Sequence, residues 1–184
     1  RDQPLTPEQH VNFAKNFGDL QGPGYMPTLE DYPNVYVQEY PDLFKGIVSD
    51  VDWHIDASFL EKPLKGAVLY ALDVPETGGD TEWSNMYLAY ESLSNGMKQK
   101  VGSLHARHTF NRFRNHRVEV PDVYKGKGKE RYVDIAPPDA IHPVVRTHPE
   151  TGRKALYISE RFTIGIEELE EKLNKQMEEN VQLK

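Results

Sequence analysis

The sequence contains no cysteine among its 184 residues. This absence excludes disulfide bonds, thiolate metal ligands and cysteine nucleophiles, and it fits a reducing cytosol without establishing one. Basic residues are also few, because 22 lysine and arginine residues stand against 29 aspartate and glutamate residues and leave a net charge of -7. Nucleic-acid binding is therefore disfavoured, since it needs a basic face that neutralises phosphates.

Long apolar runs are absent as well. No stretch reaches the roughly 20 residues of a transmembrane helix, and no secretory signal peptide is visible. We therefore expect a cytoplasmic protein with no membrane partner. Hydrophobic residues still make up 38% of the chain, enough for a core, and no linker divides it, so residues 1–184 are predicted to form a single domain. The chain begins without methionine and ends in a helix with no sheet element after it, so we expect this domain to be only partly represented.

Helical signals occur at four places. Thr6 is a candidate N-cap, Pro7 suits the first helical position, Gln9 completes a capping box, and Gly18 ends the predicted helix. Apolar residues at helical spacing predict further helices at Asn85–Leu93, from Ser94 to Val101, and from Glu167 onward.

The remaining elements are predicted to be short strands. They are expected at Val35–Val37, Trp53–Phe59, Gly66–Val74, Thr81–Trp83 and Leu104–Phe110, and in a hairpin that joins Pro143–Arg146 to Ala155–Ile158. The polar, Gly/Lys-rich stretch 111–130 is predicted to be an exposed loop or lid. Together, the predicted strands and helices indicate a mainly β architecture with added helices (α+β), for which a jelly-roll-like double sheet is a natural form.

The most informative of these strands is the one predicted at 53–59. Side chains two residues apart on a strand share a face, so His54, Asp56 and Ser58 would lie together and the apolar residues between them would face a core. An imidazole and a carboxylate side by side are half of a non-haem iron site, which needs two histidines and one carboxylate. The alternative is a half-exposed strand whose histidine and aspartate bond to each other or to water.

Further segments join the His/Asp segment, namely the opening helix, Val74–Thr81, Ala89–Leu93, His142–Pro149 and Gly152–Tyr157. In this order and spacing they resemble the taurine dioxygenase (TauD/TfdA-like) family of Fe(II)- and 2-oxoglutarate-dependent oxygenases. The resemblance covers nearly the whole chain. It implies a double-stranded β-helix, the clavaminate synthase-like jelly roll, incomplete in this chain.

The resemblance also implies roles for particular residues. His54 and Asp56 would be two of three iron ligands, and Thr81 would bind the 2-oxoglutarate carboxylate near the metal. Its implied cofactors are Fe(II) and the co-substrate 2-oxoglutarate, and a small-molecule substrate would be hydroxylated by O2 with release of succinate and CO2. The family's second histidine ligand, and the arginine that binds the far carboxylate of 2-oxoglutarate, would follow Lys184 and are not in this chain.

The substrate positions of the resemblance differ from those of a taurine enzyme. Pro23, Met26 and Asp50 stand where that enzyme has its taurine-binding side chains, so taurine is disfavoured. Phe113 and Arg114 align with another part of the substrate pocket, inside a basic cluster. Guanidinium groups there would capture an anionic group, whereas Asp50 would favour a cationic amine. A solvated loop is the equally weighted alternative for the cluster.

Other readings stay open. The remaining histidines are expected to be hydrogen-bonded or exposed, not metal ligands. A truncated or degenerate relative that only binds ligands or partners is the non-enzymatic alternative. Halogenation is disfavoured because Asp56 supplies the carboxylate ligand that a halogenase lacks. The sequence does not separate hydroxylation from desaturation, and it leaves a homo-oligomer open.

Overall fold

The structure is a computed structural model that describes residues 3–22, 28–37, 53–74, 76–77, 80–110, 137–172 and 175. It contains two compact units, each assembled from segments that are distant in the sequence. The first comprises Arg1–Val51, Leu64–Asp80 and Arg117–Ala136, and the second comprises Asp52–Pro63, Thr81–His116 and Pro137–Lys184. The loop predicted at 111–130 lies outside the described residues.

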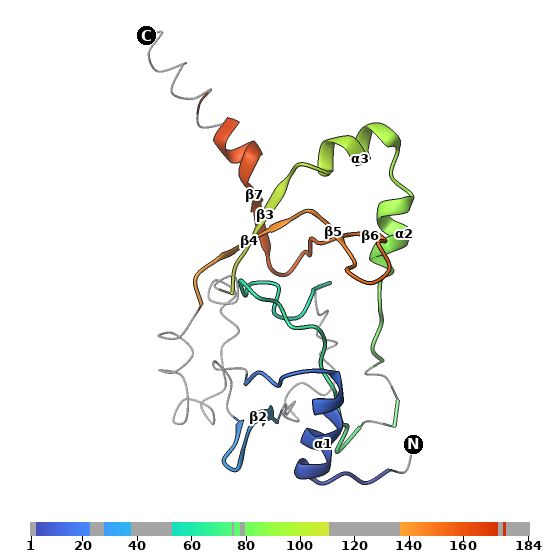
Figure 1. Cartoon of the computed structure of the whole chain (residues 1–184), viewed down its shortest axis with the longest axis vertical. Coiled ribbons are helices and arrows are strands. Elements are labelled where there is room, and N and C mark those ends of the chain that lie inside the picture. Colours follow the sequence, from blue (N-terminus) through green and yellow to red (C-terminus); the bar gives the residue numbers. More distant parts are fainter. Residues whose placement is uncertain are drawn as a thin grey trace. The chain divides into compact units, whose positions relative to one another are not determined.

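The first unit begins with helix α1 (Pro7–Ala14), which starts where the sequence predicts (Figure 1). Thr6 Oγ1 accepts a hydrogen bond from the Gln9 backbone N–H at 3.2 Å, and Gln9 Oε1 accepts one from the Thr6 N–H at 2.9 Å. The predicted capping box is therefore confirmed. The 3-10 turn η1 (Lys15–Phe17) continues the helix to Gly18, whose φ of 138° favours glycine.

Two contacts in the same unit join α1 and its N-terminal extension to the segment 66–74. Nε2 of His10 donates to the carbonyl oxygen of Val68 at 2.9 Å, and the Leu5 N–H donates to the Tyr70 hydroxyl at 3.2 Å. Elsewhere in the unit, β1 (Thr28–Leu29) pairs antiparallel with β2 (Tyr32–Tyr36), which confirms the strand predicted around residue 35.

The buried strand predicted at Gly66–Val74 is wrong. The segment has no regular structure, and Leu69 and Leu72 are 83% and 77% exposed. A strand needs a neighbour to complete its ladder of hydrogen bonds, and no strand in the described parts of the chain pairs with this segment. The strand predicted at Thr81–Trp83 is wrong for the same reason, and Trp83 is 84% exposed.

A three-stranded antiparallel sheet is the main element of the second unit. Its strands, in spatial order, are β4 (Ala140–Pro143), β3 (His105–His108) and β7 (Thr163–Ile166). Strand β3 confirms the prediction at Leu104–Phe110. In its register with β4, Ala106 lies opposite His142 and His108 opposite Ala140. All four are buried, because alternate residues of a strand share one face.

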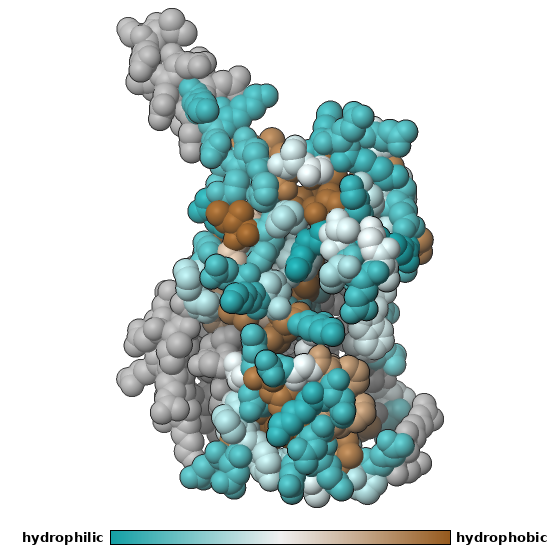
Figure 2. Space-filling view, viewed as in Figure 1, coloured by the Kyte–Doolittle hydropathy of each residue, from teal (hydrophilic) through white to brown (hydrophobic). Residues whose placement is uncertain are grey.

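Helices and a hairpin complete this unit. They are α2 (Met86–Glu91), capped by Asn85, α3 (Asn95–Val101), capped by Ser94, the hairpin of β5 (Val145–Thr147) and β6 (Lys154–Leu156), and a helix that is described over 167–172. Each confirms its prediction, and the surface over α3 is hydrophilic (Figure 2). Within the described residues, no helix has the length and apolar character that crossing a membrane requires.

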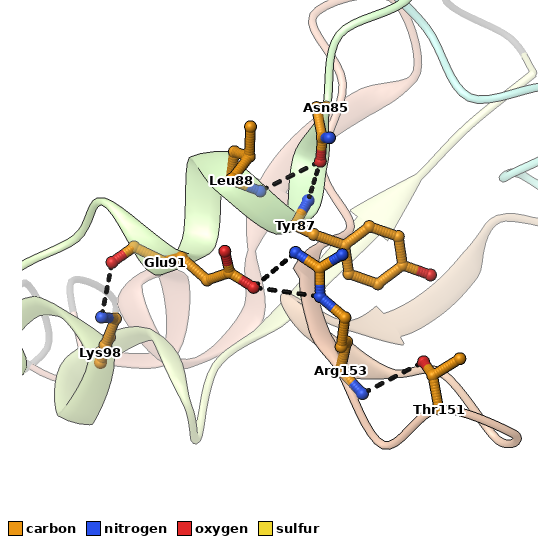
Figure 3. A network of polar contacts seen from close by, with 7 residues as sticks. All are labelled: Asn85, Tyr87, Leu88, Glu91, Lys98, Thr151 and Arg153. Carbon is orange, nitrogen blue, oxygen red and sulfur yellow. Dashed lines mark hydrogen bonds and ion pairs between the residues drawn. The ribbon is translucent and has the colours of Figure 1, made fainter.

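Helix α2 and the β5–β6 hairpin are joined by the ion pair in Figure 3. The Glu91 carboxylate accepts from Nε and Nη2 of Arg153 at 3.1 and 2.6 Å, and the Arg153 guanidinium lies 4.7 Å from the centre of the Tyr87 ring. Asn85 Oδ1 accepts from the Tyr87 and Leu88 N–H groups in the first turn of α2, and Lys98 of α3 donates to the Glu91 carbonyl at 2.7 Å. Two segments that carry the family resemblance, 89–93 and 152–157, therefore contact each other directly.

The core of the second unit is built around three phenylalanines. The Phe59 ring lies 4.9 Å from the ring centres of both Phe110 and Phe162, and each of the three is at most 9% exposed. Such aromatic pairs contribute about 0.5–1.5 kcal/mol each beyond the area they bury. The turn that contains Phe59 therefore packs against the residues that follow β3 and precede β7.

Candidate metal centre

Asp56 begins a turn and His54 lies just before it in a stretch without regular structure, so the prediction of a strand at 53–59 is wrong; we call residues 54–60 the 54–60 turn. Two hydrogen bonds form the turn, one from the Ser58 N–H to the Ile55 carbonyl at 3.2 Å and one from the Leu60 N–H to the Ala57 carbonyl at 3.0 Å. Ala57 has φ of 55°, a left-handed conformation that costs a residue other than glycine about 1–2 kcal/mol. Strained residues of this kind concentrate at functional sites.

The turn nevertheless brings the two predicted ligands together. Nε2 of His54 lies 3.2 Å from Oδ1 of Asp56, and the two side chains are 33% and 74% exposed. The His54 ring meets the Phe162 ring edge-on, with 6.1 Å between centres, and the Trp53 carbonyl accepts from the Arg161 N–H at 3.3 Å. The imidazole is thus supported on its apolar side, while its nitrogen and the carboxylate remain accessible from solvent.

The other residue of the predicted shared face behaves differently. Ser58 is fully buried, because the turn directs it inward together with its neighbours Ala57 and Phe59. Three consecutive buried residues depart from the alternation of the half-exposed strand that was predicted. His54 and Asp56 therefore form a pair without Ser58.

An imidazole nitrogen and a carboxylate oxygen at this separation fit two positions of an iron site with two histidines and one carboxylate. Among the residues that the structure describes, no group of three or more histidine, cysteine, aspartate or glutamate side chains could hold a metal ion. A third protein ligand is therefore not found in the described segments. The pair fits iron as a partial ligand set.

The structure gives less information on the remaining predicted site residues. Thr81 is exposed, in a stretch without regular structure that leads to the N-cap of α2. Asp50, Phe113 and Arg114 lie outside the described residues, as do Pro23 and Met26.

Beneath the turn lies a buried pair of histidines. Nδ1 of His108 is 3.0 Å from the Ser58 hydroxyl, and Nε2 of His142 donates to the Leu60 carbonyl at 2.9 Å. The two imidazole centres are 5.5 Å apart, and both rings contact the ring of Tyr157 at 5.7 and 5.4 Å. His108 is 0% exposed and His142 is 7% exposed; the His108–Ser58 hydrogen bond is buried and the His142–Leu60 hydrogen bond is partly buried.

Burial keeps His108 neutral. The pKa of His108 is lowered to about 4, mainly by burial and in part by the nearby His142, while the backbone of Tyr157 acts in the opposite direction. A neutral imidazole is the form that can share a hydrogen bond with a hydroxyl without leaving a charge in the core.

The opposite face of β3 carries ion pairs with the helix that starts at residue 167. Arg107 donates to both carboxylate oxygens of Glu167 at 2.7 and 2.9 Å, and Glu168 accepts from the backbone N–H and Nδ1 of His105 at 2.9 and 2.7 Å. These hydrogen bonds hold the pKa of Arg107 above its ordinary value and the pKa values of both glutamates below theirs. This face orders the helix and is separate from the turn.

The expectation that histidines other than His54 are hydrogen-bonded or exposed is confirmed for those described here. His105 pairs with Glu168, and Nδ1 of His148 accepts from two N–H groups of its own hairpin loop. The sequence did not reveal that His108 and His142 reach the candidate metal turn. The only signal was that His108 lies in the strand predicted at Leu104–Phe110; His142 lies in β4, where no strand was predicted.

Comparison with known proteins adds independent information. The family model described as "Taurine catabolism dioxygenase TauD, TfdA family" matches residues 1–181. An (S)-phenoxypropionate/alpha-ketoglutarate-dioxygenase of Sphingobium herbicidovorans is 33% identical over 163 residues, covering 85% of this chain and 55% of its own length. An alpha-ketoglutarate-dependent 2,4-dichlorophenoxyacetate dioxygenase of Cupriavidus pinatubonensis is 31% identical over 174 residues, covering 86% of this chain and 58% of its own.

Solved structures give the same picture. The crystal structure of a taurine dioxygenase from Burkholderia xenovorans matches with a TM-score of 0.59 at 31% sequence identity, over 91% of this chain and 50% of that one. The chain therefore spans about half the length of these relatives.

Proposed function

Since the chain belongs to the TauD/TfdA family of dioxygenases over residues 1–181, we propose that the protein is an Fe(II)- and 2-oxoglutarate-dependent dioxygenase that oxidises a small organic substrate. The observation that carries the proposal is the 3.2 Å approach of His54 Nε2 and Asp56 Oδ1 on an accessible turn. We further propose that the two units together form one double-stranded β-helix domain, of which the sheet β4–β3–β7 is a part.

His54 and Asp56 would supply two of three protein ligands to Fe(II), and the third would come from outside the described residues. When bound, iron and 2-oxoglutarate supply the oxidising power that places an oxygen atom from O2 on the substrate while 2-oxoglutarate becomes succinate and CO2. The protein's part is to hold the donor atoms. The support of the His54 ring by Phe162 limits the directions in which Nε2 can point.

Thr81 is proposed to donate its hydroxyl hydrogen to the 2-oxoglutarate carboxylate near the metal. Its exposed position in an irregular segment leaves the hydroxyl accessible to a ligand. Asp50, Phe113 and Arg114 are proposed to contact the substrate.

The substrate is proposed to be a small organic anion of the aryloxyalkanoate type. Two relatives are named for acting on phenoxypropionate and 2,4-dichlorophenoxyacetate, which both join an aromatic ether to a carboxylate. Arg114 would pair with the carboxylate and Phe113 would pack against the ring. Taurine fits less well, because Pro23, Met26 and Asp50 replace its binding side chains.

The test is succinate formation with Fe(II), 2-oxoglutarate and O2, comparing 2-phenoxypropionate, 2,4-dichlorophenoxyacetate and taurine. Turnover with an aryloxyalkanoate above that with taurine is expected. His54→Ala and Asp56→Ala should abolish it. His105→Ala, which alters an exposed histidine on the opposite face of β3, should not. Retained turnover in His54→Ala would show that the ligand assignment is wrong.

A second candidate function is non-catalytic binding of a ligand or partner. The observation in its favour is that no third metal-binding side chain joins the pair within the described segments. Folded protein that neither binds Fe(II) nor forms succinate with any of the three compounds would favour this candidate over the oxygenase.

A further inference from the structure

The turn that carries His54 and Asp56 needs support from outside itself. Its internal hydrogen bonds run from the Ser58 N–H to Ile55 and from the Leu60 N–H to Ala57, and the second involves a residue in the strained left-handed conformation. Metal sites require donor atoms to be held within about 0.5 Å of their productive positions. A strained turn of this kind persists where its surroundings determine its conformation.

Two buried histidines provide such surroundings. They form hydrogen bonds with the two residues that flank Phe59. His108 bonds to the Ser58 side chain, and His142 bonds to the Leu60 carbonyl. Both contacts lie within three residues after the strained Ala57. The anchors come from adjacent strands, since His108 is on β3 and His142 on β4, and both side chains lie on the same buried face of that sheet.

We propose that His108 and His142 are positioning residues that hold the 54–60 turn in the conformation that binds the metal. The metal-binding part of this inference rests on the proposed function. Neither histidine is proposed as a ligand. The neutral state of His108 is consistent with the role, because a protonated ring would bring an uncompensated charge under the turn.

The geometry distinguishes hydrogen-bond anchoring from simple filling of the core. Asparagine places its side-chain amide close to where Nδ1 of histidine lies, and glutamine places it close to Nε2. His108 uses Nδ1 and His142 uses Nε2. Anchoring therefore predicts opposite preferences at the two positions, with asparagine the better replacement for His108 and glutamine the better replacement for His142. Core filling predicts the same preference at both.

The first experiment measures amide hydrogen exchange over 54–60 in metal-free full chain. In His108→Gln and His142→Asn we expect exchange at Ser58 and Leu60 to be roughly fivefold faster than in His108→Asn and His142→Gln, the factor that corresponds to one hydrogen bond of about 1 kcal/mol. His105→Gln, on the exposed face of β3, is the control and should match the wild type. If both positions prefer the same amide, or show no preference, the anchoring role is overturned.

The second experiment follows the same variants by anaerobic titration with Fe(II) in the presence of 2-oxoglutarate, using the visible charge-transfer band of the chelate. The apparent Kd for Fe(II) should be roughly fivefold higher in His108→Gln and His142→Asn than in His108→Asn and His142→Gln. This crossed pattern repeats the one expected for hydrogen exchange. A crossed exchange pattern with equal iron affinities would overturn the link to the metal. A crossed exchange pattern with no band in the wild type would refute the proposed function while the anchoring of the turn stands.

Discussion

The neutral buried His108 makes a quantitative prediction about stability and pH. The pKa is about 4 in the native state and about 6.5 in an unfolded chain, so between these values the unfolded state binds a proton that the native state does not. The free energy of unfolding therefore falls as pH is lowered from about 6.5 to about 4, and this contribution is constant outside that window. At about 1.4 kcal/mol for each pH unit, the total loss is about 3 kcal/mol.

The assay is urea denaturation at a series of pH values, followed by far-UV circular dichroism, for the wild type and His108→Asn. The asparagine keeps an amide near Ser58 but cannot titrate. The difference in unfolding free energy between the two proteins should shrink by about 3 kcal/mol between pH 7 and pH 4. Ser58→Ala is the control, because it removes the hydroxyl partner and keeps the imidazole, so it should retain the pH dependence of the wild type.

If the free energy of unfolding falls by the same amount between pH 7 and pH 4 in the wild type and in His108→Asn, then the pH dependence does not come from His108. Glu167 and Glu168 titrate at lower pH, since hydrogen bonds from Arg107 and His105 lower the pKa of each. Their contribution is present above the ordinary carboxylate pKa and is lost as pH falls through the lowered values. It is common to both proteins and cancels in the difference.

Three further predictions concern other parts of the chain. Phe59→Ala should reduce the free energy of unfolding by about 3–5 kcal/mol in urea denaturation, because it leaves a cavity between Phe110 and Phe162; a loss below about 1 kcal/mol would mean that this core does not form. Thr81→Val should raise the KM for 2-oxoglutarate, whereas Thr81→Ser should not; equal KM values in steady-state succinate assays would remove Thr81 from the site. Arg153→Ala should lower the free energy of unfolding by no more than about 1 kcal/mol, measured by thermal denaturation, because the ion pair of Arg153 with Glu91 is about half exposed. A larger loss would show that this ion pair is a major support of α2.

Locally determined elements were predictable from the sequence. The capping box of α1 depends on Thr6 and Gln9, which are three residues apart, and both of its hydrogen bonds form as expected. The β5–β6 hairpin likewise follows from a short loop, in which Gly152 has φ of 70°. In these two cases the element is determined by residues that are close together in the sequence and belong to the element itself.

Elements that depend on distant partners were not predictable in the same way. The apolar run 66–74 was predicted to be a buried strand, yet apolar character does not reveal whether another strand will pair with it. At 53–60, the alternating pattern concealed a turn, because a left-handed alanine such as Ala57 carries no sequence signal.

The candidate site shows the same division. His54 and Asp56 were predictable because they are two residues apart, and they approach each other even though the predicted strand is a turn. The anchoring roles of His108 and His142 were not predictable, because His108 lies 50 residues from Ser58 and His142 lies 82 residues from Leu60. Only the folded chain brings these residues together.

The central claim is that His54 and Asp56 bind the iron of a 2-oxoglutarate-dependent dioxygenase. Its most direct test is an anaerobic optical titration of the protein with Fe(II) and 2-oxoglutarate, carried out in parallel on His54→Ala, Asp56→Ala and the control His105→Ala. We expect a visible charge-transfer band in the wild type and in His105→Ala, and its loss in the other two variants. A band of equal intensity in all four proteins, or no band in folded wild type, would show that His54 and Asp56 do not bind iron in this way.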